Sequence, residues 1–512
     1  MLRGHGRVRT PLPRPRELRR GEGTLVWRSP LRVRSDVRFD DVVELFADDL
    51  DAAVGWRVER VTEEPDLDVR WDPTLGAEAY RMRVSSRVVV SAADGAGAFY
   101  ALGALRQLGP HELWGHEGTL TEWPVPHVEI NDAPQFAWRG AHLDVARHFF
   151  DGAVVRRFID QVAAHRLNRL HLHLNDDQGW RVEVPAWPRL TEVGAWRPSS
   201  PAGHESEGRD DGQPHGGFFT RRELVELRHY AARRHVVIVP EIDLPGHAQA
   251  AIAAYPELGS APPGTGVWTR WGISEHVLNL EPITRRFARD VVRSVAELFP
   301  GAPFHIGGDE CPTREWEVDP RRVTLMAEHH LADERGLQGL FTAVMAHALR
   351  AGRHEVLAWD EVLDAVVPDG TVIVAWRNVE EGRRAARRGL DVIMAPMQWV
   401  YFDWLNSDAP GEPVAIGSPP RVTTWERVYA FRVVPDDFDA AMAARVRGAQ
   451  AQLWTEYIAT RDHLDYMAFP RLSAFAEVVW GTVADLADFR PRLEDHLGRL
   501  SAMGVRFRPL DL

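Results

Sequence analysis

The stretch FHIGGDE, residues 304–310, places two adjacent carboxylates directly after a short apolar run and two glycines. Side chains that are adjacent along a regular strand point to opposite faces. Asp309 and Glu310 can therefore share one pocket only where the strand has ended and the backbone turns. Gly307 and Gly308 permit such a turn. We interpret the stretch as the carboxyl end of a buried strand, where parallel α/β folds carry their chemistry.

The chain around this stretch alternates predicted strands with predicted helices. Helical stretches such as 153–165, 221–234, 284–298 and 337–350 separate segments with the apolar pattern of buried strands. This alternation predicts an α/β fold, a TIM-type (β/α)8 barrel over residues 134–512, although the connection 361–371 is too short for a full helix. The eight strands are expected at 138–145, 169–174, 236–242, 304–306, 356–359, 372–376, 392–395 and 449–454.

The residues before the barrel predict a small α+β domain over 24–133. Two stretches, 40–54 and 95–108, have helical spacing, and several short segments between them alternate as strands do. A proline-punctuated segment, 123–134, is interpreted as the linker to the barrel. Residues 1–23 are rich in Arg and Pro and lack the apolar segment of a secretory signal, so we predict a disordered tail.

Composition excludes several classes of function. The net charge is −13, which argues against nucleic acid as a partner. All 61 basic residues other than His are Arg, and the lack of Lys excludes Schiff-base catalysis and a Walker phosphate loop. A single cysteine, Cys311, excludes an intrachain disulfide and a cysteine zinc cluster. No apolar run is long enough to span a membrane, and we predict a cytoplasmic protein with no membrane partner.

Acids and tryptophans follow nearly every predicted strand, at the barrel face that holds active sites. Taken singly, these residues have structural explanations: Asp144 and Arg147 as a buried ion pair, His171 and His173 as satisfied core imidazoles, and Trp454 as plain core. Their recurrence at one face favours a catalytic site. The segments concerned are 144–148, 175–180, 241–247, 309–310, 359–361, 376–377, 399–403 and 454–456.

An ordered set of motifs resembles the family 20 glycoside hydrolases, the β-N-acetylhexosaminidases. The motifs are WRGAHLDVARHFF, RLHLHLNDDQGW, VVIVPEIDLPGHA, FHIGGDEC, VLAWDE, YFD, QLWTE and FPRLSAFAEVVW, which together span residues 138–480. Earlier in the chain, EAYRMRV and AGAFYALGALRQL resemble the N-terminal α+β domain of the same family. The resemblance implies exo-acting, retaining hydrolysis of terminal β-linked N-acetylglucosamine or N-acetylgalactosamine, with an oligosaccharide partner and no cofactor.

The catalytic roles follow from this resemblance. Two adjacent residues at one strand end cannot flank a sugar as the usual carboxyl pair does. In the family the 2-acetamido oxygen of the substrate attacks the anomeric carbon instead, and an oxazolinium ion forms. By resemblance Asp309 orients the acetamido nitrogen, Glu310 is the general acid and base, and Tyr401 hydrogen-bonds the acetamido oxygen. Asp176 and His247 resemble a polar relay that supports Glu310.

The resemblance also implies which residues bind the sugar. Arg139 resembles the arginine that holds the 3- and 4-hydroxyls, for which its planar fork is suited. Asp403 and Glu456 resemble the carboxylates that accept the remaining hydroxyls. The indoles that surround the acetamido methyl are expected to be Trp359, Trp376 and Trp454.

Two other functions remain open at this point. A metal-dependent hydrolase of the amidohydrolase kind would use His171 and His173, which share one strand face. A non-catalytic sugar-binding barrel is the second alternative, and the intact acid pair argues against it. The long polar loop 198–217 follows a strand end and is a candidate active-site lid.

Overall fold

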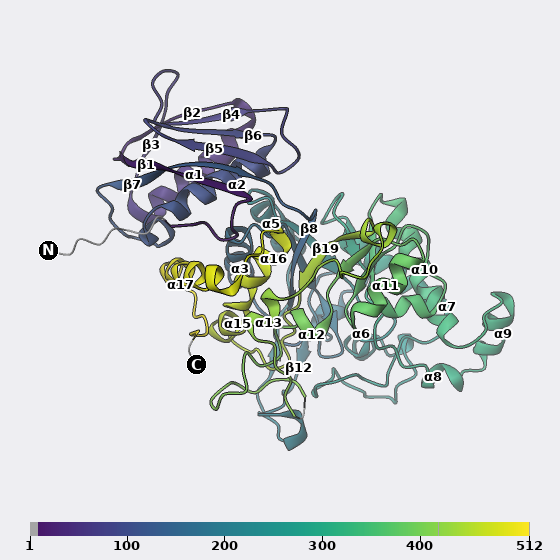
Figure 1. Ribbon diagram of the computed structural model, residues 1–512. Coiled ribbons are helices and arrows are strands. Elements are labelled where there is room, and N and C mark those ends of the chain that lie inside the picture. The colour runs from purple at the N-terminus through teal and green to yellow at the C-terminus, as the bar shows by residue number, and fades with distance from the viewer. Residues whose placement is uncertain (1–8, 418, 511–512) are drawn as a thin grey trace.

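Eight parallel strands close into a barrel in the computed structural model, which describes residues 9–417 and 419–510 (Figure 1). A seven-stranded sheet precedes the barrel, so the predicted architecture is confirmed. In chain order the barrel strands are β8 (Trp138–Asp144), β9 (Arg169–His173), β14 (Val237–Glu241), β15 (Phe304–His305), β16 (Val356–Trp359), β17 (Val372–Ala375), β18 (Val392–Met394) and β19 (Val446–Ala451).

Closure of the barrel depends on one glycine. β19 starts at Val446, three residues before the predicted start, and pairs with β8 from Gly448 opposite Trp138. Gly448 has a φ of +148°, and a Cβ there would come 1.8 Å from the Trp138 carbonyl oxygen. Only glycine lets the last strand approach the first this closely.

Helices cover the outside of the barrel, and most of the long ones begin at a residue that caps free backbone N–H groups. Asp151, Thr220, Asn378 and Asp485 each accept such a bond. No helix among the described residues is both long and apolar enough to cross a bilayer. The longer helices are α3 (Gly152–Ala164), α5 (Arg221–Ala232), α7 (Pro282–Ala296), α9 (Arg321–Glu328), α10 (Arg335–Ala351), α11 (Val379–Arg387), α15 (Arg461–Ala468), α16 (Arg471–Trp480) and α17 (Leu486–Ala502).

Two connections depart from a regular strand–helix repeat. The fifth holds only a short 3-10 turn, η5 (Asp360–Asp364), as its length predicts. The segment between β18 and β19 carries three short helices, α12 (Met397–Val400), α13 (Trp425–Tyr429) and α14 (Ala440–Ala443). Shorter pieces elsewhere are α4 (Arg189–Glu192), α6 (Gln249–Ala254), α8 (Arg314–Glu317), β10 (Asn175–Asp176), β11 (Gly179–Trp180), β12 (Trp196–Arg197), β13 (His215–Gly216), η3 (Glu205–Glu207) and η4 (Pro256–Leu258).

The N-terminal domain lays one sheet over two helices, α1 (Asp40–Val54) and α2 (Gly95–Leu108), which lie between the sheet and the barrel (Figure 1). Both helices match the predicted stretches. The sheet order is β1 (Glu17–Trp27), β7 (Trp123–Asp132), β5 (Tyr80–Val84), β6 (Val88–Ala92), β4 (Leu67–Trp71), β2 (Leu31–Ser35) and β3 (Val58–Arg60), and two 3-10 turns, η1 (Val37–Phe39) and η2 (His111–Trp114), flank the helices.

The predicted linker is a strand. β7 spans Trp123–Asp132 and pairs with β1 on one side and β5 on the other. Pro124 and Pro126 lie in the part of β7 that pairs only with β1. Proline removes a donor from the ladder, which is tolerated where one side of the strand is unpaired. The domain boundary therefore falls after Asp132.

The predicted tail is ordered from residue 9 onward, and residues 1–8 lie outside the described part of the chain. Leu12 is completely buried in the barrel core, and its N–H donates to Gln107 Oε1 at 2.7 Å. Arg14 donates its N–H to Glu477 at 3.1 Å, and β1 begins at Glu17. β1 is an edge strand with mostly exposed polar residues, so its sequence lacks the apolar pattern on which strand prediction depends.

Asp132, the last residue of β7, joins the two domains. Its carboxylate accepts from Arg166 at 2.7 Å and from the Trp480 indole at 2.9 Å, both in the barrel. Tyr80, in the small domain, donates to the same carboxylate at 3.0 Å. All four side chains are buried, so neither domain can leave the other without stranding a charge.

We expect Leu12→Ala to lower the melting temperature, because the change leaves a cavity in a closed core. The free energy of unfolding should fall by about 2 to 4 kcal/mol, as is usual when a buried leucine is replaced by alanine. Leu486→Ala, at a leucine that is 45% exposed, is the control and should have little effect. Differential scanning calorimetry measures both. Equal, small shifts would show that the segment before β1 does not pack as described.

Candidate active site

A cavity of about 370 Å³ opens at the carboxyl ends of the barrel strands. This is the barrel face at which the sequence placed its acids and tryptophans. The pocket brings together residues from five strand ends that are far apart in the chain. Seven predicted site residues line it: Asp309, Glu310, Trp376, Tyr401, Asp403, Trp454 and Glu456.

The loop after β15 turns the two acids toward the cavity. Gly307 and Gly308 have φ values of +64° and +93°, and Glu310 itself has a φ of +44°. A non-glycine residue with positive φ is uncommon and strained, and such residues concentrate at functional sites. The turn predicted from the two glycines is present, and it lets adjacent acids share one pocket.

Asp243 explains why residue 307 has to be glycine. A Cβ on Gly307 would come 1.8 Å from Asp243 Oδ1. The same oxygen accepts the Gly308 N–H at 2.8 Å, so Asp243 fixes the acid loop. Burial, and then repulsion from Asp243, raise the pKa of Asp309 well above its usual range, while His247 acts in the opposite direction. The two carboxyls resist being ionised together.

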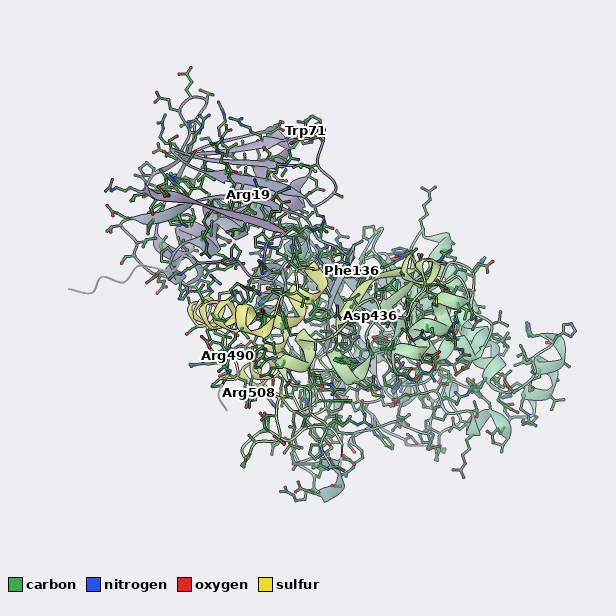
Figure 2. The ribbon with its side chains drawn as sticks, in the orientation of Figure 1. Arg19, Trp71, Phe136, Asp436, Arg490 and Arg508 are labelled. Atoms are coloured by element: carbon green, nitrogen blue, oxygen red, sulfur yellow. The ribbon has the colours of Figure 1, made fainter. Side chains whose placement is uncertain are left out.

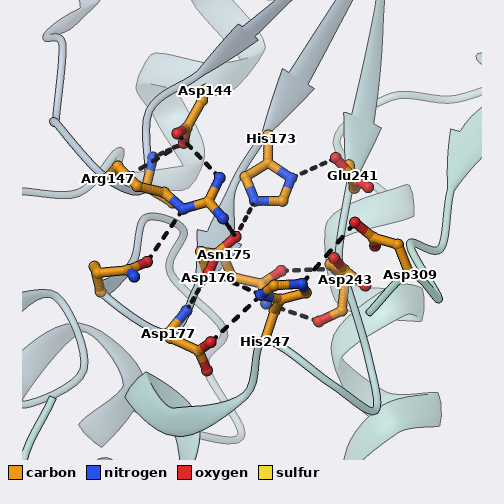
Figure 3. A network of polar contacts seen from close by, with 12 residues as sticks. Asp144, Arg147, His173, Asn175, Asp176, Asp177, Glu241, Asp243, His247 and Asp309 are labelled. Atoms are coloured by element: carbon orange, nitrogen blue, oxygen red, sulfur yellow. Dashed lines mark hydrogen bonds and ion pairs between the residues drawn. The ribbon is translucent and has the colours of Figure 1, made fainter. Parts of the chain in front are cut away.

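His247 lies between Asp309 and a second set of carboxylates, those of Asp176 and Asp177 (Figure 3). Its Nε2 is 3.7 Å from Glu310 Oε2 and 3.9 Å from Asp309 Oδ2. Its Nδ1 lies 3.1 Å from Asp176 Oδ1 and 3.3 Å from Asp177 Oδ2. Burial disfavours charge on the imidazole, but the neighbouring carboxylates, Asp176 foremost, together outweigh it and raise the pKa of His247 well above its usual value. Asp176 therefore contacts His247, and His247 lies next to Glu310; that the two residues support Glu310 stays a prediction.

The side of the pocket near Asp309 is aromatic. The rings of Trp376 and Tyr401 stack with centroids 6.0 Å apart. The Trp376 indole donates to Glu361 Oε2 at 2.8 Å, and its backbone N–H donates to Asp360 at 2.8 Å. Burial, followed by repulsion from Asp309, raises the pKa of Glu361 well above the usual value. Glu361 was not predicted as a site residue, although it directly follows the WD pair at the exit of β16.

Another part of the lining is polar. Burial and the neighbouring Glu456 raise the pKa of Asp403 well above the usual value. Burial also raises the pKa of Glu456, against the effect of Arg147. Arg147 lines the cavity, lies over the Trp454 ring at 5.0 Å and pairs with Asp176 at 2.8 Å. Arg147 pairs with Asp144, as the structural interpretation of the sequence predicts, and it also lines the pocket.

Several buried polar atoms around the cavity lack a hydrogen-bond partner among the described residues. They are Asp309 Oδ1, Asp403 Oδ1, Glu456 Oε2 and His247 Nε2. Buried polar groups are otherwise almost always paired, since an unpaired one costs about 1 to 3 kcal/mol. Unpaired oxygens that surround one cavity are suited to accept hydroxyl and amide N–H groups of a ligand.

Arg139 is not in this pocket, and its prediction as the sugar-binding arginine is corrected. It is the second residue of β8, at the opposite end of the barrel, and is completely buried at the domain junction. Its Nε donates to Arg166 O at 2.9 Å, and its Nη2 contacts Glu78 and Tyr100. The rule that barrel chemistry lies at strand carboxyl ends already favoured Arg147, three residues beyond the end of the same strand.

Trp359 lies behind the pocket instead of on its surface. It is completely covered, its ring centroid is 6.0 Å from that of Trp454, and its indole donates to Glu241 Oε1 at 2.8 Å. Two of the three predicted indoles, Trp376 and Trp454, line the cavity directly. Because Trp359 ends β16 with its side chain inside the barrel, it supports the wall.

The histidines of the metal-hydrolase alternative have other partners. His173 bridges Asp176, at 2.8 Å, and Glu241. His171 contacts Gln450 at 2.9 Å and Glu241 at 3.1 Å. Both lie inside the barrel below the pocket, as the core interpretation of these imidazoles predicts.

The predicted lid, residues 198–217, reaches the rim of the pocket. Its base is the β12–β13 pair, and its tip is held by three neighbouring loops. His204 contacts the carbonyl of the pocket residue Gly417 at 3.1 Å. Glu205 accepts from Arg270 at 2.7 Å, and its backbone N–H donates to the Tyr457 hydroxyl at 3.2 Å. Whether this loop opens is still a prediction.

A larger cavity, about 410 Å³, lies between the two domains. It is lined by α1, α2, α3 and α5, and its guanidinium groups are paired with acids, as in Arg106–Asp49 and Arg234–Asp160. The three acids that line it, Asp48, Asp49 and Asp160, are each paired with an arginine. The chemistry of the smaller cavity therefore identifies the candidate active site.

Comparisons with known proteins agree with this site. The family model for the catalytic domain of glycosyl hydrolase family 20 matches residues 136–483, and the model for domain 2 of the same family matches residues 11–133. A beta-hexosaminidase of Porphyromonas gingivalis is 37% identical over 91% of this chain, and the chain spans 60% of that protein's length. A beta-hexosaminidase of Vibrio furnissii is 34% identical, with 91% of this chain and 75% of the relative covered.

Solved structures show the same arrangement of both domains. The GH20 beta-N-acetylhexosaminidase of Streptomyces coelicolor superposes with a TM-score of 0.84 at 30% identity, covering 98% of each chain. A Vibrio harveyi GH20 exo beta-N-acetylglucosaminidase, solved with N-acetylglucosamine, gives a TM-score of 0.87 at 30% identity over 99% of this chain and 80% of its own. The barrel and its acid-lined pocket are those of a glycoside hydrolase. Within that class, the chain belongs to glycosyl hydrolase family 20.

We expect Arg139→Met to lower the melting temperature, because it leaves Glu78 without its buried partner. Breaking a buried ion pair costs about 3 to 5 kcal/mol. Arg19→Met, at an exposed arginine of β1 (Figure 2), is the matched control and should change stability little. Thermal unfolding of both variants measures the difference. If the Arg139 variant were as stable as the control, the junction would not depend on this arginine.

Proposed function

We propose that the chain is an exo-acting, retaining β-N-acetylhexosaminidase. It removes terminal non-reducing β-linked N-acetylglucosamine or N-acetylgalactosamine, and the substrate's own 2-acetamido group is the nucleophile. Membership of family 20 supports this proposal, as do the relatives named beta-hexosaminidase.

The observation that carries the proposal is the position of the two acids. Asp309 and Glu310 both approach the same nitrogen of His247, at 3.9 and 3.7 Å. They therefore occupy one side of the pocket and do not face each other across a sugar ring. A protein nucleophile and a general acid have to flank the glycosidic bond. A site with both carboxylates on one side favours a nucleophile supplied by the substrate.

In the first step the acetamido oxygen attacks the anomeric carbon as the bond to the leaving oxygen breaks. Glu310, the more exposed acid with 37% of its side chain accessible, donates its proton to that leaving oxygen. Asp309 accepts the acetamido N–H and stabilises the positive charge that spreads onto the nitrogen. Tyr401 donates its hydroxyl to the acetamido oxygen, and Trp376 and Trp454 enclose the methyl group.

In the second step Glu310, now a carboxylate, takes a proton from water. The water oxygen attacks the anomeric carbon, the ring bond to the acetamido oxygen breaks, and the acetamido group re-forms. Each step inverts the anomeric centre, so the configuration is retained. His247, which is buried and paired with Asp176, supports Glu310 in both of its protonation states.

The polar side of the pocket binds the sugar hydroxyls. Asp403 Oδ1 and Glu456 Oε2 have no protein partner among the described residues and accept O–H groups. Arg147 supplies the donor role first assigned to Arg139, since its planar fork lies at the cavity over Trp454. The fixed pattern of donors and acceptors holds the terminal sugar and gives the exo mode of action.

The proposal requires Asp309 to be ionised while burial and Asp243 raise its pKa. Two cations offset this. His247 Nε2 lies 3.9 Å from Asp309 Oδ2, and the oxazolinium-like transition state brings a second positive charge next to the carboxylate. The interaction is strongest in the transition state, which is the condition for accelerating the reaction.

A panel of p-nitrophenyl β-glycosides tests the function. The 2-acetamido glucoside and galactoside should be hydrolysed, whereas the plain 2-hydroxy glucoside should be slower by about a thousandfold or more in kcat/KM, because it lacks the nucleophile. Asp309→Ala should reduce kcat on the acetamido substrates by about a hundredfold. Comparable turnover of the 2-hydroxy glucoside, or a covalent sugar trapped on any Asp or Glu by a 2-fluoro glycoside, would refute substrate assistance.

A second prediction concerns pH. Asp243→Asn removes the like charge that raises the pKa of Asp309 but keeps the oxygen that accepts the Gly308 N–H. The pKa of Asp309 should fall, so the acidic limb of the kcat/KM profile should move to lower pH by about one unit. Asp436→Asn, at an exposed acid, is the control. An unchanged or upward-shifted limb would contradict the described coupling.

A further inference from the structure

Glu241 lies at the centre of the barrel interior, below the pocket, and is completely buried. It is the last residue of β14, and the register places it opposite His173 of β9 and His305 of β15. Parallel pairing therefore puts an imidazole on each side of one carboxylate. A third imidazole, His171, lies 3.1 Å from Oε2.

Both oxygens of Glu241 are occupied. Oε2 contacts His173 Nδ1 and His171 Nε2, and Oε1 accepts the Trp359 indole at 2.8 Å and lies 2.9 Å from His305 Nδ1. A buried carboxylate needs such a shell, because burying an unpaired charge is costly. These contacts hold the Glu241 carboxylate in position, and the carboxylate in turn holds the side chains that contact it.

One of these contacts leads to the general acid. His173 contacts two carboxylates (Figure 3). Its Nδ1 contacts Glu241 Oε2, and its Nε2 lies 2.8 Å from Asp176 Oδ2. Asp176 Oδ1 contacts His247, which lies 3.7 Å from Glu310. Although burial opposes it, Glu241 and Asp176 together raise the pKa of His173 to about 10, so the imidazole is cationic between two carboxylates. The position of Glu310 is thus connected to Glu241 through three side chains.

The other contact leads to the aromatic wall. Trp359, held by its indole N–H on Glu241, packs behind Trp454, with centroids 6.0 Å apart. Trp454 lines the cavity. Rotation of the Trp359 ring would move the surface against which the sugar packs. Glu241 therefore contacts both the series of side chains that leads to Glu310 and the tryptophan that packs behind the pocket wall.

We propose that Glu241 is a positioning residue for the hydrolysis, which orients the support of Glu310 through His173 and the pocket wall through Trp359. The inference rests on the proposed function, since it assigns Glu310 as the general acid. Glu241 touches no substrate atom. It determines whether protonation of the leaving group and enclosure of the sugar occur in the same geometry.

Glu241→Gln is the main test, because glutamine keeps the shape and removes the charge that holds His173 cationic. We expect kcat/KM to fall by about ten- to a hundredfold on a substrate with a poor leaving group, such as the β-linked N-acetylglucosamine disaccharide. The loss on p-nitrophenyl N-acetylglucosaminide should be clearly smaller, since a good leaving group needs little protonation. Glu241→Leu, which removes the acceptors as well, should lose more on both.

Glu477→Gln is the matched control. Glu477 is also a completely buried glutamate, and its partners Arg492 and Tyr429 do not line the pocket. Its loss should lower the melting temperature and leave the ratio of the two substrates unchanged. A double-mutant cycle between Glu241→Gln and Asp176→Asn should be non-additive if the effect passes through Asp176.

Trp359→Phe separates the two arms, because it removes the N–H that Glu241 accepts and keeps an aromatic ring behind Trp454. It should raise KM and leave the substrate ratio as in the wild type. If Glu241→Gln does not fold, His173→Asn breaks the same arm one residue further on and should give the same leaving-group-dependent loss.

Other results would overturn the inference. One is an equal loss on both substrates for Glu241→Gln, or for His173→Asn where that variant carries the test. Another is a profile that matches Glu477→Gln. A stoichiometric transition metal in the purified protein, lost in Glu241→Gln, would also overturn it, because the imidazoles would then be ligands. Failure of the proposed function itself is distinct, since the wild type would then hydrolyse neither acetamido substrate.

Discussion

Compensation of buried charge beneath the pocket is the constraint on which the site depends. From Arg147 through Asp176 and His173 to Glu241, charges alternate in sign, and each contacts the next. The coupling appears in the pKa of Asp176, which Arg147 and His247 lower well below its usual value even though burial acts to raise it. An isolated buried ion would cost several kcal/mol, so no member of this series is stable without its neighbours. The ion pairs beneath the pocket therefore determine its geometry.

The acid loop shows how a local sequence feature and a distant one determine each other. Gly307 and Gly308 permit the turn, but Asp243, on a different strand, makes glycine obligatory at 307 by filling the space of its Cβ. The same carboxyl raises the pKa of Asp309. Asp243 thus determines both the position of the acid loop and the pKa of Asp309, although it lies in a different segment of the chain.

Much of the fold was accessible from the sequence, because buried parallel strands are short apolar runs with polar residues at their ends. All eight barrel strands and the helices at 40–54 and 95–108 were predicted. β7 and the beginning of β1 were missed, since prolines and arginines on an edge pair resemble a linker and a tail. Seven pocket residues were predicted because strand exits converge in any barrel. Arg139 and Trp359 were misplaced. Arg139 was assigned by resemblance although it lies near the amino end of its strand, and a strand pattern does not say how deep the Trp359 side chain lies.

The domain junction has a consequence for how the chain can be divided. Arg139 and Arg166 belong to the barrel but are neutralised by Glu78 and Asp132 of the small domain. A barrel expressed alone from residue 134 would expose two guanidinium groups in an apolar surface and release the Trp480 indole from its acceptor. Exchanging the small domain between relatives would therefore succeed only if the new domain carried acids at the positions of Glu78 and Asp132. For engineering, the smallest transferable piece of this hydrolase is the pair of domains, joined at one aspartate.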